Sequence, residues 1–357
     1  MKICCIIASL RLGGAERQLA GLAAMLRRAG HDVEVITYRD GDFYASVLQD
    51  AGVENVRIPT GGGDFMIVKR IAAHLRQTGC ELLISFLAGT NVKACMVKRR
   101  CPSVRLIVSE RNNNRVLLPH DIFRFCMYGR AEKTVCNSHS QEAFIRKHFP
   151  PLRRRLCTVT NFADTEYFSP ADGGGSNGGE VIRILVTARL DKRKNAHALI
   201  RAAAECSCPN LRFDWYGAAE ESRYRHECLG LIHKYGLSGR FLIHDAAADV
   251  RELYRTADFF CLPSFYEGTP NSLAEALSCG LPAAVSDVSD NSCYVADGVN
   301  GFLFNPRDIS SISSALCRIA GTTAAQRQQF GRKSRENAEK SFEKNIFLSK
   351  WLNIIER

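Results

Sequence analysis

The sequence contains no run of about 18 apolar residues, the length that a membrane-spanning helix requires. The paired cysteine spacings of zinc motifs are also missing: the 15 cysteines are scattered, and only Cys4-Cys5 and Cys206-x-Cys208 form clusters. There is no helix-turn-helix, zinc-finger or RNP-like pattern either. We therefore expect no membrane span, no metal site and no nucleic-acid partner, and we interpret the cysteines as small, reduced core residues.

The amino terminus shows no targeting segment. Residues 1–8 are apolar but too short for a signal peptide, and a loop and a helical pattern follow at once. Together with the reduced cysteines, this pattern predicts a cytoplasmic protein.

Length and charge indicate the number of domains and the kind of partner. At 357 residues, with 46% hydrophobic and 24% charged residues, the chain suits two domains better than one core. The net charge of +11 is concentrated in the first half, where residues 1–170 hold 25 Lys and Arg against 15 Asp and Glu. Such an excess attracts an anionic partner, and phosphate or lipid headgroups fit it better than nucleic acid does here.

The first half alternates between strand and helix patterns. A buried strand is predicted at residues 2–8, a helix at 15–29 and a strand at 32–37, which together form a βαβ unit. Its first turn contains Gly13-Gly14, where the backbone could approach a phosphate, although the pair also suits a plain tight turn. Further strands are predicted at 81–86, 104–109 and 133–138.

The second half repeats this alternation after the glycine-rich residues 171–180, which predict a flexible linker. Its strands are expected at 181–188, 211–216, 240–244, 258–262, 281–286 and 301–304, and its last part, 309–357, is helical. We expect two doubly wound α/β domains with a ligand at the carboxyl ends of their strands. The expected divisions are 1–170, the linker 171–180, 181–335, and a C-terminal helical segment 336–357.

Residues 264–280 are the most informative stretch, because a loop there runs directly into a helix. Thr269 is the expected N-cap, Pro270 suits the first helical position and Gly280 supplies a stop. The helical spacing divides the side chains between a core face and a polar face. The core face has Leu273, Ala276 and Leu277, and the polar face has Asn271, Ser272 and Glu275.

Two glutamates flank the start of this helix, Glu267 before it and Glu275 within it. A helix N-terminus attracts anions, so the arrangement suits a ligand that is anionic in the middle and hydroxylated at both ends, as a nucleotide sugar is. The alternative is that both carboxylates are merely solvated. The loop at residues 189–195 adds cations beside another helix start, which is either a second anion site or a solvated turn.

Taken together, these stretches resemble the GT-B-fold retaining glycosyltransferases of glycosyltransferase family 4. The resemblance covers almost the whole chain, and the glutamate pair and the Arg/Lys loop are its specific parts. The residues that carry it are Gly13-Gly14-Ala15-Glu16-Arg17, Ala188-Arg189-Leu190 with Lys194-Asn195, Tyr216-Gly217, residues 266–276 around Glu267 and Glu275, and Asp297-Gly298-Val299-Asn300-Gly301-Phe302-Leu303.

The resemblance implies a fold and a set of roles in the second domain. Two Rossmann-like domains would face a central cleft, with the C-terminal helices packing back toward the first domain. Arg189 and Lys194 would hold the donor diphosphate, Glu275 would bind the ribose hydroxyls and Glu267 would lie against the sugar. The remaining donor-binding residues would be Gly268, Thr269 and Asn271. The family needs no metal, so no cofactor is expected apart from the donor, which we expect to be UDP-linked.

In the first domain, the resemblance implies that Gly13 and Gly14 close over the donor phosphates. The chain departs from the family near the reaction centre, because Arg111 falls where many members have a histidine. This departure resembles a subgroup that transfers sugars, often N-acetylhexosamines, in bacterial polysaccharide and glycolipid assembly. Retaining transfer can use the leaving phosphate as base, so activity does not require that histidine.

Residues 117–156 interleave aromatic and basic side chains in the positive first domain. The aromatic residues are Phe123, Phe125, Phe144 and Phe149, and the basic ones are Arg124, Arg130, Arg146, Lys147 and Arg153-Arg154-Arg155. We interpret this region as a face for an anionic membrane bearing a lipid-linked acceptor, which predicts a peripheral protein on the inner face of the cell membrane. The alternative is that the phenylalanines belong to the core.

The function expected from the sequence is therefore retaining, metal-independent transfer of a hexose or N-acetylhexosamine from a UDP-sugar to a glycan or lipid-linked acceptor. The expected setting is the assembly of bacterial surface polysaccharide, lipopolysaccharide or capsule. Two alternatives share the same two-domain architecture: a sugar-nucleotide 2-epimerase and a non-catalytic nucleotide-sugar-binding protein. The first lacks an evident set of acids and histidines for proton abstraction, and the intact charged residues argue against the second.

Overall fold

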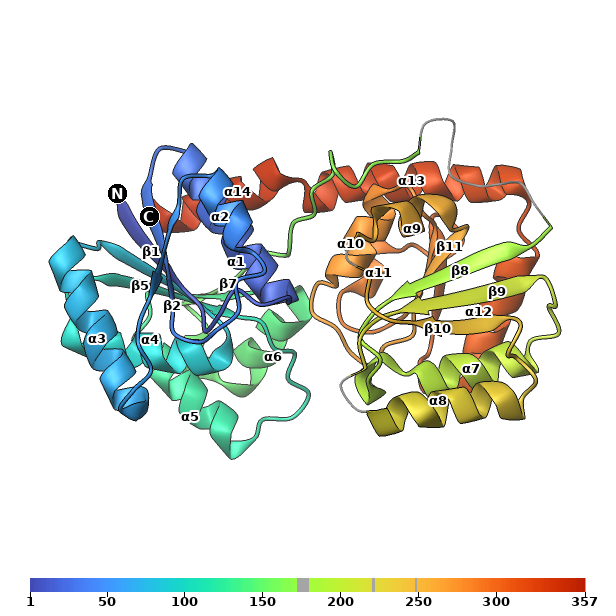
Figure 1. The fold of residues 1–357 in the computed structure, drawn as a ribbon, viewed down its shortest axis with the longest axis horizontal. Helices are drawn as coiled ribbons and strands as arrows, with labels where there is room; N and C mark the ends of the chain where they lie inside the picture. Colours follow the sequence, from blue (N-terminus) through green and yellow to red (C-terminus); the bar gives the residue numbers. More distant parts are fainter. Residues whose placement is uncertain (172–179, 220–221, 248, 357) are drawn as a thin grey trace. The chain divides into compact units, whose positions relative to one another are not determined.

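The computed structural model describes residues 1–171, 180–219, 222–247 and 249–356 (Figure 1). Contacts divide the chain into two compact units, Met1–Asn161 with Phe347–Arg357, and Phe162–Ile346. The division falls before the expected linker at 171–180, because Ala163 and Phe168 already pack in the core of the second unit. Residues 172–179 of that linker lie outside the described residues.

The first unit is built on seven parallel strands in the order β3-β2-β1-β4-β5-β6-β7. They are β1 (Lys2–Ile6), β2 (Asp32–Thr37), β3 (Glu54–Arg57), β4 (Leu82–Phe86), β5 (Arg105–Glu110), β6 (Lys133–Cys136) and β7 (Leu156–Thr158). Both faces of such a sheet are covered, so β4 is buried along its whole length. The sequence did not reveal β3 or β7, because both are short and lack a clear apolar run.

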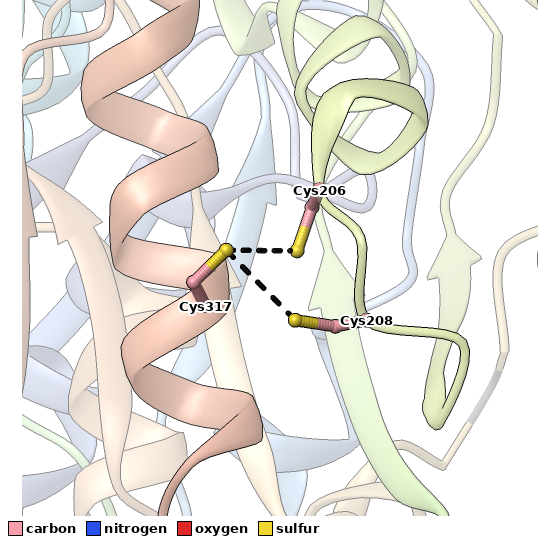
Figure 2. Close-up of side chains that lie close together, drawn as sticks. All are labelled: Cys206, Cys208 and Cys317. Carbon is pink, nitrogen blue, oxygen red and sulfur yellow. Dashed lines mark hydrogen bonds between the residues drawn. The ribbon is translucent and has the colours of Figure 1, made fainter.

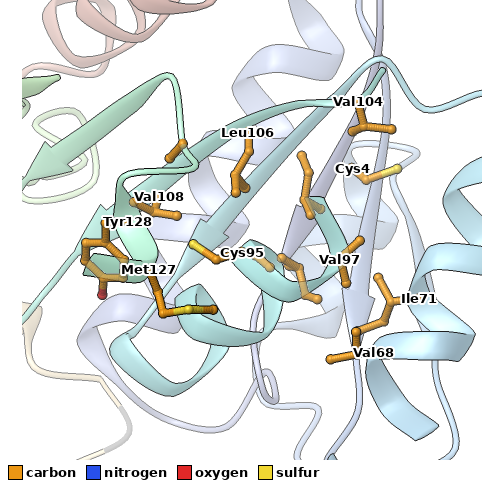
Figure 3. Packing of buried hydrophobic residues seen from close by; sticks show 14 of the residues in the cluster. Cys4, Val68, Ile71, Cys95, Val97, Val104, Leu106, Val108, Met127 and Tyr128 are labelled. Carbon is orange, nitrogen blue, oxygen red and sulfur yellow. The ribbon is translucent and has the colours of Figure 1, made fainter. Parts of the chain in front are cut away.

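The helices of the first unit connect these strands and bury their apolar stripes on the sheet. They are α1 (Gly14–Arg28), α2 (Ala45–Asp50), α3 (Gly63–Thr78), α4 (Ala88–Arg100), α5 (Pro119–Tyr128) and α6 (His139–His148). Figure 3 shows part of the resulting core, where Cys4 and Cys95 pack among aliphatic side chains. Both cysteines are fully buried, as expected for small apolar residues.

The C-terminal helix α14 (Lys344–Ile355) belongs to the first unit from Phe347 onward. Trp351 is fully buried and stacks on Phe86, with ring centroids 5.9 Å apart. Arg105 also donates a hydrogen bond to the carbonyl of Ile355, at 2.7 Å. The end of the chain therefore packs on the first unit, as the sequence predicted, whereas α13 (Ala324–Phe342) belongs to the second unit.

The second unit has six parallel strands in the order β10-β9-β8-β11-β12-β13. The strands are β8 (Ile182–Thr187), β9 (Leu211–Tyr216), β10 (Phe241–His244), β11 (Phe259–Leu262), β12 (Ala283–Ser286) and β13 (Gly301–Phe304). Its helices, besides α13, are α7 (Ala196–Glu205), α8 (Ser222–Lys234), α9 (Arg251–Thr256), α10 (Asn271–Ser278), α11 (Asn291–Tyr294) and α12 (Ile309–Ala320). The expectation of two doubly wound α/β units is confirmed.

Gly217 shows how tightly the strands of the second unit approach at their carboxyl ends. A Cβ atom at this position would lie 1.8 Å from the carbonyl oxygen of Ala188, which belongs to the backbone and cannot move aside as a flexible side chain can. The glycine is therefore required where the chain leaves β9 beside the end of β8.

We predict that Gly217→Ala lowers the free energy of unfolding by at least about 2 kcal/mol, because the new methyl group overlaps backbone atoms. Gly230→Ala is the matched control: Gly230 lies within α8, and a Cβ there would meet nothing within 4 Å. That control should gain stability of about 0.5–1 kcal/mol from helix propensity. Urea unfolding measures both, and equal stability of the two variants would contradict the close approach.

Candidate active site

The candidate site lies at the topological switch point of the second sheet, where the strand order reverses. From β8 the chain proceeds to β9 and β10 on one side, and it later returns to β11 on the other side of β8. The loops that leave β8 and β11 therefore diverge at the carboxyl edge, which is the position at which open α/β sheets bind ligands. Arg189, Lys194 and Glu267 all lie in these two loops.

The loop after β8 is a compact cationic turn. Asp191 accepts hydrogen bonds from the backbone N–H groups of Arg193 and Lys194, at 2.9 and 3.2 Å, and so caps a single 3-10 turn, Lys192–Lys194. Burial alone would raise the pKa of Asp191, but its hydrogen bonds to Arg193 and the charges of Arg193 and Arg189 hold it below the ordinary value. The carboxylate is thus charged and keeps the cations of the turn together.

Asn195 ties this turn to the neighbouring loops. Its backbone has φ 60°, in the left-handed region that asparagine tolerates better than most residues. Its side-chain amide donates to the carbonyls of Pro263 and Pro306, at 3.1 and 2.9 Å, and is buried. The N–H of Phe265 adds a backbone hydrogen bond to Arg193. The loops after β8, β11 and β13 are therefore joined through one side chain.

Lys194 and Glu267 meet directly in this arrangement. The Lys194 Nζ donates to Glu267 Oε1 at 2.5 Å, and the exposed fractions of the two side chains are 20% and 11%. The backbone N–H of Glu267 also donates to the hydroxyl of Ser289, in the segment that follows β12. Two residues that are 73 positions apart in the sequence thus form one partly buried ion pair at the carboxyl edge.

Helix α10 begins one residue later than the sequence predicted. Its first residue is Asn271 and its N-cap is Pro270, so the expectation of Thr269 as the N-cap is wrong. Thr269 is instead buried, and its hydroxyl lies 3.5 Å from that of Tyr294. Gly268 and Asn271 are half-buried next to the start of the helix.

Glu275 is more buried than its place on the predicted polar face implied. Its exposed fraction is 4%, because Tyr254 of α9 covers it and donates a hydrogen bond to its carboxylate at 3.0 Å. The hydroxyl of Thr187, at the end of β8, lies 2.6 Å from that of Tyr254. Tyr254 and Thr187 are site residues that sequence reasoning missed, because only the packing of α9 against α10 brings them together. The expected core face of α10, by contrast, is fully buried as predicted.

In the first unit, Gly13 is the N-cap of α1 and leaves room for a carboxylate. A Cβ at Gly13 would lie 2.2 Å from Oε2 of Glu16, whose side chain folds back over the start of its own helix. Burial raises the pKa of Glu16, although a backbone hydrogen bond and Arg11 oppose this shift. Gly13 and Gly14 do lie at the turn after β1, beside the point where this sheet also reverses direction.

Arg111 follows β5 in the first unit and presents unused hydrogen-bond donors. Its guanidinium carbon lies 4.1 Å from the ring centroid of Phe86, and its Nη1 donates to Asn161 at 2.6 Å. Among the described residues, its Nε and Nη2 are buried without a partner. Burial lowers the pKa of Arg111 to about 9, so the group remains a cation at neutral pH. Such a side chain can bind an anionic group through two N–H donors.

A buried polar network, which sequence reasoning missed, holds the segment that carries Arg111. Glu110 accepts hydrogen bonds from the hydroxyl of Tyr128 at 2.9 Å and from the N–H of Asn112 at 3.0 Å, and Arg124 lies 3.4 Å from the same carboxylate. Burial raises the pKa of Glu110, and Arg124 opposes this shift. Helix α5 supplies both Tyr128 and Arg124, so the network forms only when α5 packs beside the end of β5.

Two carboxylates with a spacing that could suit a metal ion occur in the first unit, at Asp40 and Asp42. Both form ion pairs with Arg57 at the end of β3. Arg57 therefore offsets one of the two negative charges and engages both carboxylates.

The expected membrane-facing phenylalanines are largely core residues, which corrects the interpretation of residues 117–156. Phe125 is fully buried, and Phe144 and Phe149 pack against the core of the first unit. Arg124 is also buried, in the network with Glu110. What remains exposed is a group around the start of α5, here called the α5 apolar patch: Val116, Leu118, Ile122 and Phe123, with exposed fractions of 65%, 46%, 43% and 58%.

Known proteins match the chain in both sequence and fold. The profile described as Glycosyltransferase Family 4 matches residues 12–167, and that described as Glycosyl transferases group 1 matches residues 175–337. The chain is 26% identical to the GalNAc-α-(1→4)-GalNAc-α-(1→3)-diNAcBac-PP-undecaprenol α-1,4-N-acetyl-D-galactosaminyltransferase of Campylobacter jejuni, a match that covers 99% of this chain and 98% of that protein. A UDP-Gal:α-D-GlcNAc-diphosphoundecaprenol α-1,3-galactosyltransferase of Escherichia coli is 28% identical over 52% of this chain and 51% of its own length.

Solved structures share the whole fold. Anabaena Alr3699/HepE in complex with UDP and glucose superimposes with a TM-score of 0.87 at 19% identity, covering 100% of this chain and 99% of that one. The lipopolysaccharide outer core galactosyltransferase WaaB gives a TM-score of 0.76 at 15% identity, with 99% of each chain covered. Because the two profiles span both units and the fold matches along the full chain, this protein belongs to the GT-B glycosyltransferases, with a family 4 amino-terminal domain and a group 1 carboxyl-terminal domain.

Proposed function

We propose that this glycosyltransferase moves a hexose or N-acetylhexosamine from a UDP-sugar to a lipid-linked glycan, with retention of the anomeric configuration and without a metal ion. The observation that carries the proposal is the ion pair of Lys194 with Glu267 at the carboxyl edge of the second sheet. It puts a cation and a hydroxyl-binding carboxylate side by side next to the start of α10.

The donor would bind with its diphosphate at the cationic turn. Arg189, whose side chain is 51% exposed, and Lys194 would hold the phosphate oxygens, and the backbone N–H groups of Gly268 and Thr269 would add hydrogen bonds. Glu275 would accept hydrogen bonds from the ribose hydroxyls, and Tyr254 would keep that carboxylate in position. Glu267 would turn toward the sugar hydroxyls once phosphate replaces it as the partner of Lys194.

The transfer step follows from these positions. The acceptor hydroxyl oxygen forms the new bond to the anomeric carbon, and the bond from that carbon to the phosphate oxygen breaks with its electron pair leaving on UDP. The proton of the acceptor passes to the departing phosphate, which lies on the same face of the sugar. Lys194 and Arg189 would stabilise the negative charge that develops there, which is the electrostatic role that a metal ion has in other phosphate chemistry.

The first unit would supply binding groups of its own. Gly13 and Gly14 would allow its backbone to approach a phosphate, and Arg111 would donate from Nε and Nη2 to an anionic group. The network around Glu110 would keep Arg111 in position, since it fixes the backbone on which that side chain is carried.

The names of the relatives support a lipid-linked acceptor, because the Campylobacter jejuni and Escherichia coli enzymes are both named for undecaprenol-linked substrates. Among the described residues no helix has the combination of length and apolar character needed to cross a bilayer. In this proposal the protein meets its acceptor as a peripheral protein on the inner face of the cell membrane. The α5 apolar patch would enter the interface, and the positive charge of the first half would attract anionic headgroups.

The stereochemistry and metal dependence of the reaction test this proposal. Proton NMR of the product should show the anomeric configuration of the donor, and turnover should persist in excess EDTA because Arg189 and Lys194 balance the charge of the leaving group. The result against the proposal would be an inverted product, or activity that EDTA abolishes and Mg²⁺ or Mn²⁺ restores.

Liposome co-sedimentation tests the membrane partner. The protein should bind vesicles that contain anionic lipid, release as salt rises toward about 0.5 M, and bind less when Ile122 and Phe123 are both changed to Ser. Phe43→Ser is the matched control, because Phe43 is 55% exposed and lies outside the patch. Equal recovery with neutral and anionic vesicles, or equal loss in the control, would show that the α5 apolar patch is no membrane contact.

A further inference from the structure

Three cysteine thiols meet at the end of α7 that lies away from the candidate active site (Figure 2). Cys206 is the C-cap of α7, Cys208 lies in the segment before β9, and Cys317 projects from α12. The Sγ atom of Cys317 lies 3.3 Å from that of Cys206 and 3.8 Å from that of Cys208, and all three Sγ atoms lie within 4.8 Å of one another. The first residue of α7 adjoins Asn195 of the active-site turn, so the helix separates the two places by about 15 Å.

These distances suit a shared metal ion. Two thiolates bound to one tetrahedral zinc ion, each at about 2.3 Å, have sulfur atoms about 3.8 Å apart. A disulfide would instead require a separation of about 2.05 Å and would involve only two of the three thiols. The observed spacings match the metal geometry with small adjustments, and all three sulfur atoms point toward one another.

Burial and charge also favour a metal site over a purely apolar cluster. Cys206 is buried, whereas Cys208 is half-buried and Cys317 is exposed, so the cluster is open to solvent on one side. Cysteines that serve only as core residues differ from these, as the fully buried Cys261 shows. Arg240 donates a hydrogen bond to the carbonyl of Cys208 at 2.8 Å. Three thiolates and one divalent ion would carry a net charge of −1, so a neighbouring cation would stabilise the occupied site.

We propose that Cys206, Cys208 and Cys317 bind a thiophilic metal ion, with Zn²⁺ as the expected occupant. Thiolates select Zn²⁺ over Mg²⁺, Ca²⁺ and Mn²⁺, and the solvent-exposed side leaves a fourth position for water. The ion would join the end of α7, the segment before β9 and α12, and so link residues 111 positions apart in the second unit. This structural role is separate from sugar transfer, which makes no use of the site.

Zinc binding to the untagged, reduced full-length protein tests this proposal. After metal removal and addition of Zn²⁺, the wild type should retain one zinc ion per chain through gel filtration and unfold at a higher temperature, because an ion that binds only the folded state stabilises it. Cys206→Ser, Cys208→Ser and Cys317→Ser should each weaken zinc binding at least about tenfold and lose the thermal shift. Cys293→Ser, at an exposed cysteine of the same unit, should behave as the wild type does.

Cys206 is buried, so a serine there can prevent folding. Cys317 is exposed, and Cys317→Ser should retain a native circular dichroism spectrum. The Cys317 variant therefore tests zinc binding in a folded protein. Either of two results would overturn the proposal. The first is that the reduced wild type retains no zinc, whether or not the unreduced protein contains a Cys206–Cys317 disulfide. The second is that Cys317→Ser binds zinc as tightly as the wild type does.

Discussion

The two hydrogen bonds of the Asn195 amide are the constraint on which the candidate donor site depends. They connect the cationic turn after β8 to the loops that follow β11 and β13, three segments that are distant in sequence. The backbone hydrogen bond from Phe265 to Arg193 is a second link between the turn and the loop after β11, and together these contacts place Lys194 beside Glu267. Asparagine suits this position for two reasons: it tolerates the left-handed backbone, and its amide supplies two donors to carbonyls that would otherwise be buried and unpaired.

The polar residues of the two units are held by different means. In the second unit, loops at a sheet edge carry Lys194 and Glu267, and their ion pair holds these two side chains together. In the first unit, Arg111 depends on a buried network around Glu110 that also engages Tyr128 and Arg124. A buried network is costly when incomplete, and Nε and Nη2 of Arg111 are buried without a partner among the described residues.

Much of this arrangement could be predicted from the sequence, because it depends on local patterns. The alternating strands and helices predicted two doubly wound units, and residues 264–280 predicted the helix that carries Glu275. Features that arise from packing could not be predicted. Helix α9 covers Glu275 with Tyr254, and the core takes in Phe125, which the sequence pattern had suggested for a membrane face. The cysteine spacing likewise gave no metal motif, since Cys317 joins Cys206 and Cys208 only when α12 packs on α7.

Calorimetric titration with UDP tests the central claim, that the turn after β8 and the start of α10 form a nucleotide-diphosphate site. The wild type should bind UDP at one site, and Lys194→Ala should bind it at least about tenfold more weakly, as expected for the loss of one charge-assisted hydrogen bond. Lys192→Ala removes an equal charge from the same turn at an exposed position and should bind UDP as the wild type does. A wild type that binds no UDP, or equal affinities of the wild type and Lys194→Ala for UDP, would contradict a nucleotide-diphosphate site at this turn.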